Sequence, residues 1–257
     1  MKKILLLGLM LFQMFTVSGQ VFEKENHMFW AFAGIQKDIG EKFSIGYDQL
    51  HSYDINERGF NFIQSNLQFS YRPVRAWTFS VSYEPTLKIN DDPNDQLIYH
   101  RISGEIRLYT RISGSIRMNN AINAEQNFTQ GSKYQQRYYY RLDLYYRNTS
   151  LPWRLRPYIT QRLYLYNNGR LLQYYDEEGE KLDLKSPDGL HAYRVYAGIR
   201  FYPTSNFRFS LLFMRQVEFN TKLLGSRDIH SLNPNTNSIR RSFNNFSVFG
   251  IMLSADI

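Results

Sequence analysis

Residues Trp77–Ile89 read WTFSVSYEPTLKI. Every odd-numbered position holds an apolar or aromatic side chain or Pro85, and every even-numbered position holds a polar or charged one. Successive side chains on a β-strand point to opposite faces, so this stretch predicts a strand with one apolar and one polar face. A barrel strand that crosses a bilayer needs about 9–11 residues, and the stretch is long enough. It is typical of an outer-membrane β-barrel.

The same alternation recurs along the rest of the chain. Turn-forming Asn, Asp, Gly, Pro and Ser separate the alternating stretches. The strands that the pattern predicts are Phe29–Lys37, Lys42–Asp54, Phe60–Arg72, Trp77–Ile89, Leu97–Thr110, Ser113–Glu125, Tyr134–Arg147, Trp153–Tyr166, His191–Tyr202, Phe207–Phe219 and Asn245–Asp256. Together they predict an all-β fold, a transmembrane antiparallel up-and-down β-barrel.

Short and long connections alternate strictly between these strands. Outer-membrane barrels have short periplasmic turns and longer extracellular loops, so we expect the long set to be extracellular. The long connections are Ile55–Gly59, Asn90–Gln96, Gln126–Lys133, Asn167–Leu190 and Asn220–Asn244. Bacterial single-chain barrels have an even number of strands. The eleven stretches therefore predict about twelve strands, with one still unrecognised, or ten if Phe29–Lys37 lies outside the wall.

The N-terminus has the features of a secretory signal peptide. Lys2 and Lys3 precede an apolar run, and the small residues Ser18 and Gly19 precede the expected cleavage point. We expect residues 1–19 to be the signal, residues 20–27 an N-terminal periplasmic segment and residues 28–257 the barrel. This organisation predicts Sec export to the outer membrane of a Gram-negative bacterium. The chain has no cysteine, which excludes disulfides and thiolate chemistry.

The alternation also predicts which charged side chains face the lumen. The opposite register would place arginines in hydrocarbon, at about 2–4 kcal/mol each near the midplane. The expected charged lining comprises Arg101, Glu105, Arg107, Arg117, Glu125, Arg137, Arg141, Asp143, Arg154, Arg156, Arg162, Arg194, Arg200 and Arg208. Arginine outnumbers carboxylate in this set. Two interpretations follow: a narrow lumen that Arg–carboxylate and Arg–Tyr bonds close, or an anion-preferring pore.

Aromatic residues near strand ends predict a second feature of a membrane barrel. Tyr and Trp gather at both membrane–water interfaces. The interfacial candidates are Trp77, Tyr134, Tyr146, Trp153 and Tyr193. The last strand alternates Phe249, Ile251, Leu253, Ala255 and Ile257, which resembles the C-terminal signal that the barrel-assembly machinery reads, although it ends in Ile rather than Phe.

Four stretches carry a resemblance to a known family. They are Arg137–Tyr146 (RYYYRLDLYY), Arg154–Tyr166 (RLRPYITQRLYLY), Tyr193–Tyr202 (YRVYAGIRFY) and Phe207–Gln216 (FRFSLLFMRQ). Their order is similar to that of an exported barrel family catalogued as domain of unknown function 2490. The resemblance implies an outer-membrane barrel from about Trp30 to Ile257 and implies no activity.

Three functional classes follow from these observations. The first is a scaffold or accessory barrel that binds an envelope protein through Asn167–Leu190 and Asn220–Asn244, because loops this long are usually functional or disordered. The second is the pore. The third is a rim-sited lipid-modifying enzyme, for which the five histidines (His27, His51, His100, His191 and His230) are the candidate bases.

We expect no enzymatic activity, no catalytic residue, no metal and no cofactor, because the histidines are scattered and no nucleophile motif accompanies them. The formal charge is +8 and becomes +6 when Lys2 and Lys3 are removed with the signal. Export makes nucleic acid an unsuitable partner for this charge. Outer-membrane lipid and lipopolysaccharide are the expected partners instead.

Overall fold

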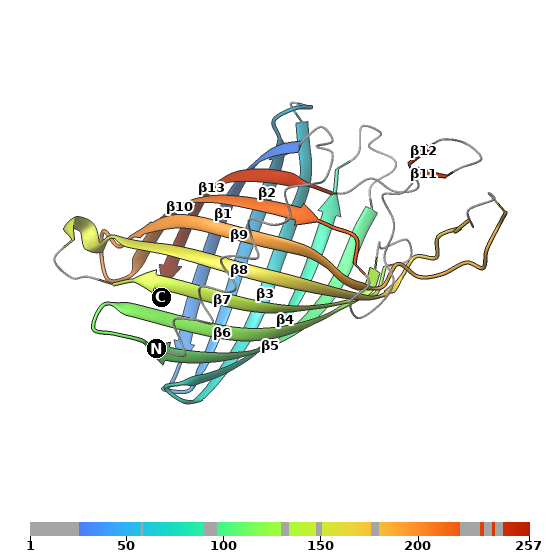
Figure 1. Ribbon diagram of the computed structural model, residues 1–257. Coiled ribbons are helices and arrows are strands. Elements are labelled where there is room, and N and C mark those ends of the chain that lie inside the picture. The colour runs from blue at the N-terminus through green and yellow to red at the C-terminus, as the bar shows by residue number, and fades with distance from the viewer. Residues whose placement is uncertain are drawn as a thin grey trace.

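The computed structural model describes residues 26–57, 59–89, 97–129, 134–147, 151–175, 180–221, 232–233, 238–239 and 244–257. In this part of the chain, eleven strands form a closed barrel (Figure 1). The wall strands are β1 (Asn26–Ile39), β2 (Phe43–Asp54), β3 (Gly59–Val74), β4 (Trp77–Lys88), β5 (Leu97–Arg111), β6 (Ile116–Asn127), β7 (Tyr134–Tyr146), β8 (Arg156–Gly169), β9 (Gly189–Phe201), β10 (Phe207–Glu218) and β13 (Phe246–Asp256). The all-β barrel that the sequence predicts is confirmed.

The odd number of strands determines how the barrel closes. When each strand is antiparallel to the next, the first and last strands of an odd set run in the same direction. β1 and β13 accordingly pair in parallel, from Asn26↔Phe246 to Gln36↔Asp256, and every other neighbouring pair in the wall is antiparallel. An even number was expected, and the described wall has eleven strands. The parallel ladder is evenly hydrogen-bonded and closes the sheet without an additional strand.

The two ends of the barrel differ as the sequence predicts. β1 starts at the end that carries the long connections, and β13 finishes at the end that carries the short turns. Two small strands, β11 (Leu232–Asn233) and β12 (Ser238–Ile239), pair with each other in the connection between β10 and β13. The signal peptide expected at residues 1–19 lies outside the described residues, and β1 begins two residues before the expected barrel start.

Alternation along the strands assigns the faces as expected. On β4, Trp77, Phe79, Val81 and Tyr83 are exposed on the outer face, whereas Ser80 and Ser82 are buried inside. The same outward apolar band continues around the wall, and Ile122 of β6 is 65 % exposed. No helix in the described residues combines the length and apolar character that a membrane span requires.

One predicted strand begins later than expected. Residues Pro152–Arg154 form the short 3-10 helix η1, and Trp153 and Arg154 have positive φ angles of 52° and 49°. Consecutive residues in the left-handed region cannot continue a strand, so β8 starts at Arg156. Arg154 is therefore an exposed turn residue and does not line the lumen, which corrects the prediction from alternation.

Gly198 on β9 lies where the backbone of β10 and the Tyr158 ring leave no room for a side chain. A Cβ added there would lie 2.5 Å from the carbonyl oxygen of Leu211 and 2.7 Å from Cζ of Tyr158. We expect Gly198→Ala to lower the free energy of unfolding by about 1–3 kcal/mol, because the backbone oxygen cannot move away without disturbing the ladder. Gly104→Ala is the matched control, since a Cβ there meets nothing within 4 Å. Urea unfolding of both variants in micelles checks this, and equal losses would contradict the packing argument.

Candidate functional site in the barrel lumen

The lumen contains a cavity that extends along the barrel. Its volume is about 1340 Å³. Gln36, Arg208 and Met252 line it near the short-turn end, and Asp54 and Asn244 line it near the long-connection end. The described side chains therefore enclose one cavity that reaches from near one end of the lumen to near the other.

Most of the charged lining lies where alternation predicted it. The members that border the cavity are Arg101, Glu105, Arg107, Glu125, Arg137, Arg141, Asp143, Arg162, Arg194, Arg200 and Arg208. Arg117 lies near the short-turn end, where its Nη1 donates a hydrogen bond to the carbonyl of Ser113 at 3.0 Å. The guanidinium carbon of Arg156 lies 4.0 Å from the centre of the Tyr202 ring.

Carboxylates neutralise the arginines on β5 and β7. Arg137 Nε lies 2.5 Å from Glu125 Oε2, and Arg101 Nε lies 3.8 Å from the same oxygen. Arg101 also pairs with Glu84 of β4. These residues lie on four neighbouring strands, so their ion pairs link β4 to β7 on the inside of the wall.

A second ion-pair group continues this network. Glu105 accepts from Arg107 Nη2 at 2.6 Å and from Arg141 Nη1 at 2.9 Å. Asp143 lies 3.3 Å from Arg141 Nε and accepts a hydrogen bond from the Thr160 hydroxyl at 2.8 Å. Arg–carboxylate pairs thus bond the side of the lumen formed by β4 to β7, as the closed interpretation predicted.

Three arginines occupy adjacent positions on three neighbouring strands. Arg141 of β7 is in register with Arg162 of β8, and Arg162 is in register with Arg194 of β9. Like charges directly opposite each other across strands destabilise a sheet. Arg141 has two carboxylate partners, whereas Arg162 and Arg194 have no carboxylate within 4 Å among the described residues. This row, Arg141–Arg162–Arg194, places three arginines side by side on the lumen face of the described wall.

Aromatic rings support the arginines that lack a carboxylate. The Arg162 guanidinium lies 4.9 Å from the Tyr196 ring and 5.3 Å from the Tyr139 ring. Arg194 lies 5.0 Å from the Tyr164 ring, and its Nε donates to Gln216 Oε1. Cation–π contacts hold a guanidinium in place without cancelling its charge. The row therefore remains cationic toward the cavity.

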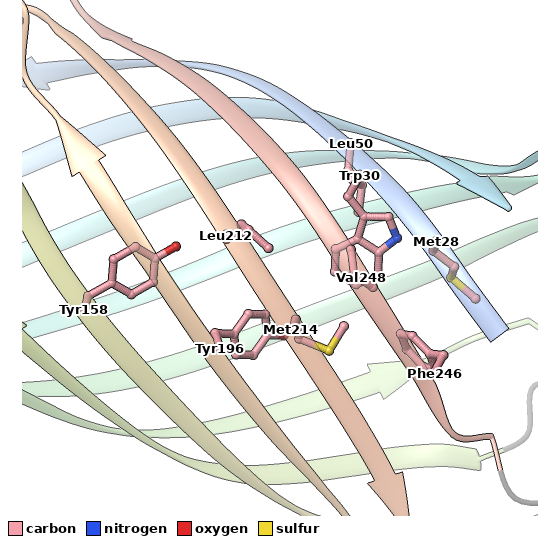
Figure 2. Close-up of a cluster of buried hydrophobic side chains, with 9 residues drawn as sticks. All are labelled: Met28, Trp30, Leu50, Tyr158, Tyr196, Leu212, Met214, Phe246 and Val248. Carbon is pink, nitrogen blue, oxygen red and sulfur yellow. The ribbon is translucent and has the colours of Figure 1, made fainter. Parts of the chain in front are cut away.

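The part of the lumen next to the arginine row is apolar, which alternation did not predict. The buried cluster shown in Figure 2 consists of Met28, Trp30, Leu50, Tyr158, Tyr196, Leu212, Met214, Phe246 and Val248. Its β1 and β13 members come from strands with apolar residues on both faces, so the alternation signal is weak there. Eight members come from β1, β2, β9, β10 and β13, and Tyr158 comes from β8. We call this set the apolar wall.

A β-bulge between β8 and β9 turns one histidine inward near the long connections. The β8–β9 register shifts between Tyr164 and Leu165, so the β8–β9 pairing skips His191, whose side chain is fully buried. Its ring lies 4.9 Å from that of Tyr134 and 4.6 Å from that of Tyr166. A bulge adds one residue and reverses the alternation locally.

Tyr134 was expected at the outer interface, and this prediction is wrong. The residue is 4 % exposed, borders the cavity and lies 4.0 Å from the Tyr166 ring. It faces Gly169 across the strands, and a Cβ at Gly169 would come within 3.0 Å of Tyr134 Cδ1. The missing side chain leaves room for the ring to fold inward.

The other aromatic candidates lie outside the lumen. Trp77 and Tyr146 are each 41 % exposed at the short-turn end, and Trp153 is 72 % exposed in the turn before β8. Tyr193 is half-buried on the outer face, opposite Leu163 and Val217.

Several polar groups near the described histidines have other bonding partners. Asp188 accepts hydrogen bonds from the Gly169 backbone and from Ser186. Ser52, beside His51, accepts from the Trp30 indole at 3.0 Å. His100 Nδ1 lies 2.7 Å from the Tyr83 hydroxyl. His230 lies outside the described residues.

No model of a known protein family matches the chain, and no curated protein matches it either.

Proposed function

We propose that the protein is an outer-membrane barrel of a Gram-negative bacterium and that its lumen is a narrow, anion-preferring pore. The single observation that carries this proposal is the Arg162–Arg194 pair, which has no carboxylate within 4 Å among the described residues and borders a cavity that extends along the barrel. Rings of arginine attract anions into pores, and low-dielectric walls strengthen this attraction. The apolar outer band supports the membrane location, because hydrocarbon would cover it. The closed barrel supports it as well, because every strand satisfies its backbone hydrogen bonds within the sheet.

The volume of the cavity sets the size of solute that the pore would pass. Spread over a hydrocarbon core about 30 Å thick, the volume corresponds to a mean cross-section of about 45 Å², which is roughly 7–8 Å across. This width suits small ions and small organic anions. It is too narrow for a folded protein.

Conductance of the purified mature protein in a planar bilayer tests the pore. Under a potassium chloride gradient, we expect steady openings and a reversal potential that indicates anion preference. Arg162→Gln should reduce the anion-to-cation permeability ratio about fivefold, the factor for roughly 1 kcal/mol at intermediate dielectric.

The matched control is Arg215→Gln. Arg215 lies on β10 beside Gln216 but points to the opposite face, in register with Val195. We expect this variant to keep the selectivity of the parent protein. A folded barrel without conductance would reject the pore, and equal effects of both variants would reject the assignment of selectivity to Arg162.

A scaffold is the second candidate, and the β8–β9 connection favours it. Figure 1 shows this segment extending beyond the barrel wall. Leu172 and Lys185 exchange backbone hydrogen bonds at 3.0 and 3.2 Å, and Leu171, Leu182 and Leu184 are exposed. A paired arm with exposed leucines suits an envelope protein partner. Replacing the three leucines by serine should abolish site-specific crosslinks to that partner and leave conductance unchanged.

The resemblance to the family catalogued as domain of unknown function 2490 stays a prediction. It is compatible with either candidate, because it implies a barrel without an activity.

A further inference from the structure

We infer that the lumen binds an anionic amphiphile, a small molecule with one carboxylate or phosphate head group and an apolar tail. The head group would lie at Arg162 and Arg194, and the tail would lie along the apolar wall. This inference rests on the proposed function and names the class of solute that the lumen selects.

The head-group site follows from the register of the arginines. A guanidinium presents several N–H donors in a planar fork that matches carboxylate and phosphate oxygens. Arg162 and Arg194 are direct cross-strand neighbours, and both border the cavity. An anion between them would offset their mutual repulsion, because neither arginine has a carboxylate within 4 Å among the described residues.

The tail site begins where the head-group site ends. Arg194 is in register with Gln216 of β10, and Gln216 is in register with Phe246 of β13. The Arg194 guanidinium lies 5.7 Å from the Phe246 ring. Tyr196 joins the two regions, because it contacts Arg162 and belongs to the apolar wall.

The apolar wall is long enough for an extended chain. Together with Met252, which also borders the cavity, it follows β13 from Phe246 for six residues, about 20 Å at 3.3–3.4 Å per residue. Trp30, Phe32 and Leu212 border the cavity beside this path. The lumen therefore has a cationic side and an apolar side that meet at Tyr196.

Quenching of Trp30 fluorescence by a brominated chain tests the site without requiring conductance. The chain has three tryptophans, and replacing Trp77 and Trp153 by phenylalanine leaves only the one in the lumen. The probe is 11-bromoundecanoate, compared with 11-bromoundecanol, which has the same tail without charge, and with bromoacetate, which has the charge without the tail. We expect only 11-bromoundecanoate to quench Trp30 at low concentration.

Two variants and one partition control separate the outcomes. In the single-tryptophan background, we combine Arg162→Gln with Arg194→Gln. The double variant should need about 10-fold to 100-fold more 11-bromoundecanoate for half-maximal quenching, the loss of affinity expected for charge-assisted hydrogen bonds. Arg215→Gln should leave it unchanged. A Trp30→Phe protein that retains Trp77 reports how much probe enters the surrounding detergent, because Trp77 lies on the outer face.

Each result decides the inference. Selective quenching that the double variant loses supports it. Equal quenching by the acid and the alcohol overturns the role of the arginines, and equal quenching by bromoacetate overturns the role of the apolar wall. Conductance without any quenching of Trp30 overturns the binding site and leaves the pore standing. Selective quenching in a barrel that does not conduct supports the site and rejects the pore.

Discussion

Trp30→Ala is expected to destabilise the barrel by about 3–5 kcal/mol, the range for removal of a buried tryptophan. The side chain is 7 % exposed, and its ring lies 5.9 Å from Phe32, 6.4 Å from Phe62 and 6.3 Å from Phe246. Its indole N–H donates to Ser52. The substitution would open a cavity in the apolar wall and leave the buried hydroxyl without its donor. Urea unfolding in micelles measures the loss.

Trp77→Ala is the control for this experiment. The same side chain is removed, but Trp77 lies on the outer face at the start of β4 and is 41 % exposed. We expect a loss of at most about 1 kcal/mol, as for a substitution away from the packed interior. Similar losses for the two variants would mean that the apolar wall contributes little to stability.

Ile122→Arg is expected to destabilise the protein in lipid bilayers by about 2–4 kcal/mol, the cost of an arginine on the lipid face near the midplane. Ile122 lies in the middle of β6 and is 65 % exposed, so the arginine meets no steric obstacle. The cost arises only if hydrocarbon surrounds this face. Reversible unfolding from lipid vesicles therefore tests the proposed membrane location as well as the orientation of β6.

Ile112→Arg makes the same chemical change in a different environment. Ile112 is 53 % exposed and follows β5 in the short turn before β6. A turn outside the hydrocarbon tolerates the charge, so we expect a change of at most about 0.5 kcal/mol. An unchanged free energy of unfolding for Ile122→Arg would contradict the proposal that the outer face lies in a membrane.

The strands of the wall could be predicted because alternation is a local property. β4 and β5 begin at the expected residues, and their inner and outer faces agree with the sequence pattern. The prediction failed at Arg154, where two left-handed residues form a turn that no alternating pattern reveals. The expectation of an even count came from the usual bacterial barrels, and the parallel β1–β13 pair removes that requirement.

The candidate site was predictable only in part. The sequence assigns Arg162 and Arg194 to the lumen, because each follows the period of its own strand. That the two arginines are direct neighbours depends on the register between β8 and β9. Tyr134 folds inward opposite Gly169, whose missing side chain leaves room for the ring, and the alternation within β7 does not reveal this.

The sequence by itself determined the fold class, the positions of the strands and the face of most residues. Each strand shows its own alternation of apolar and polar residues, which does not depend on the other strands. The tertiary structure alone decided the parallel closure, the arginine row and the position of the apolar wall beside it. These three features depend on pairing between strands, and β1 and β13 are far apart in the chain. Inter-strand register is a property of the closed sheet, which no single segment specifies.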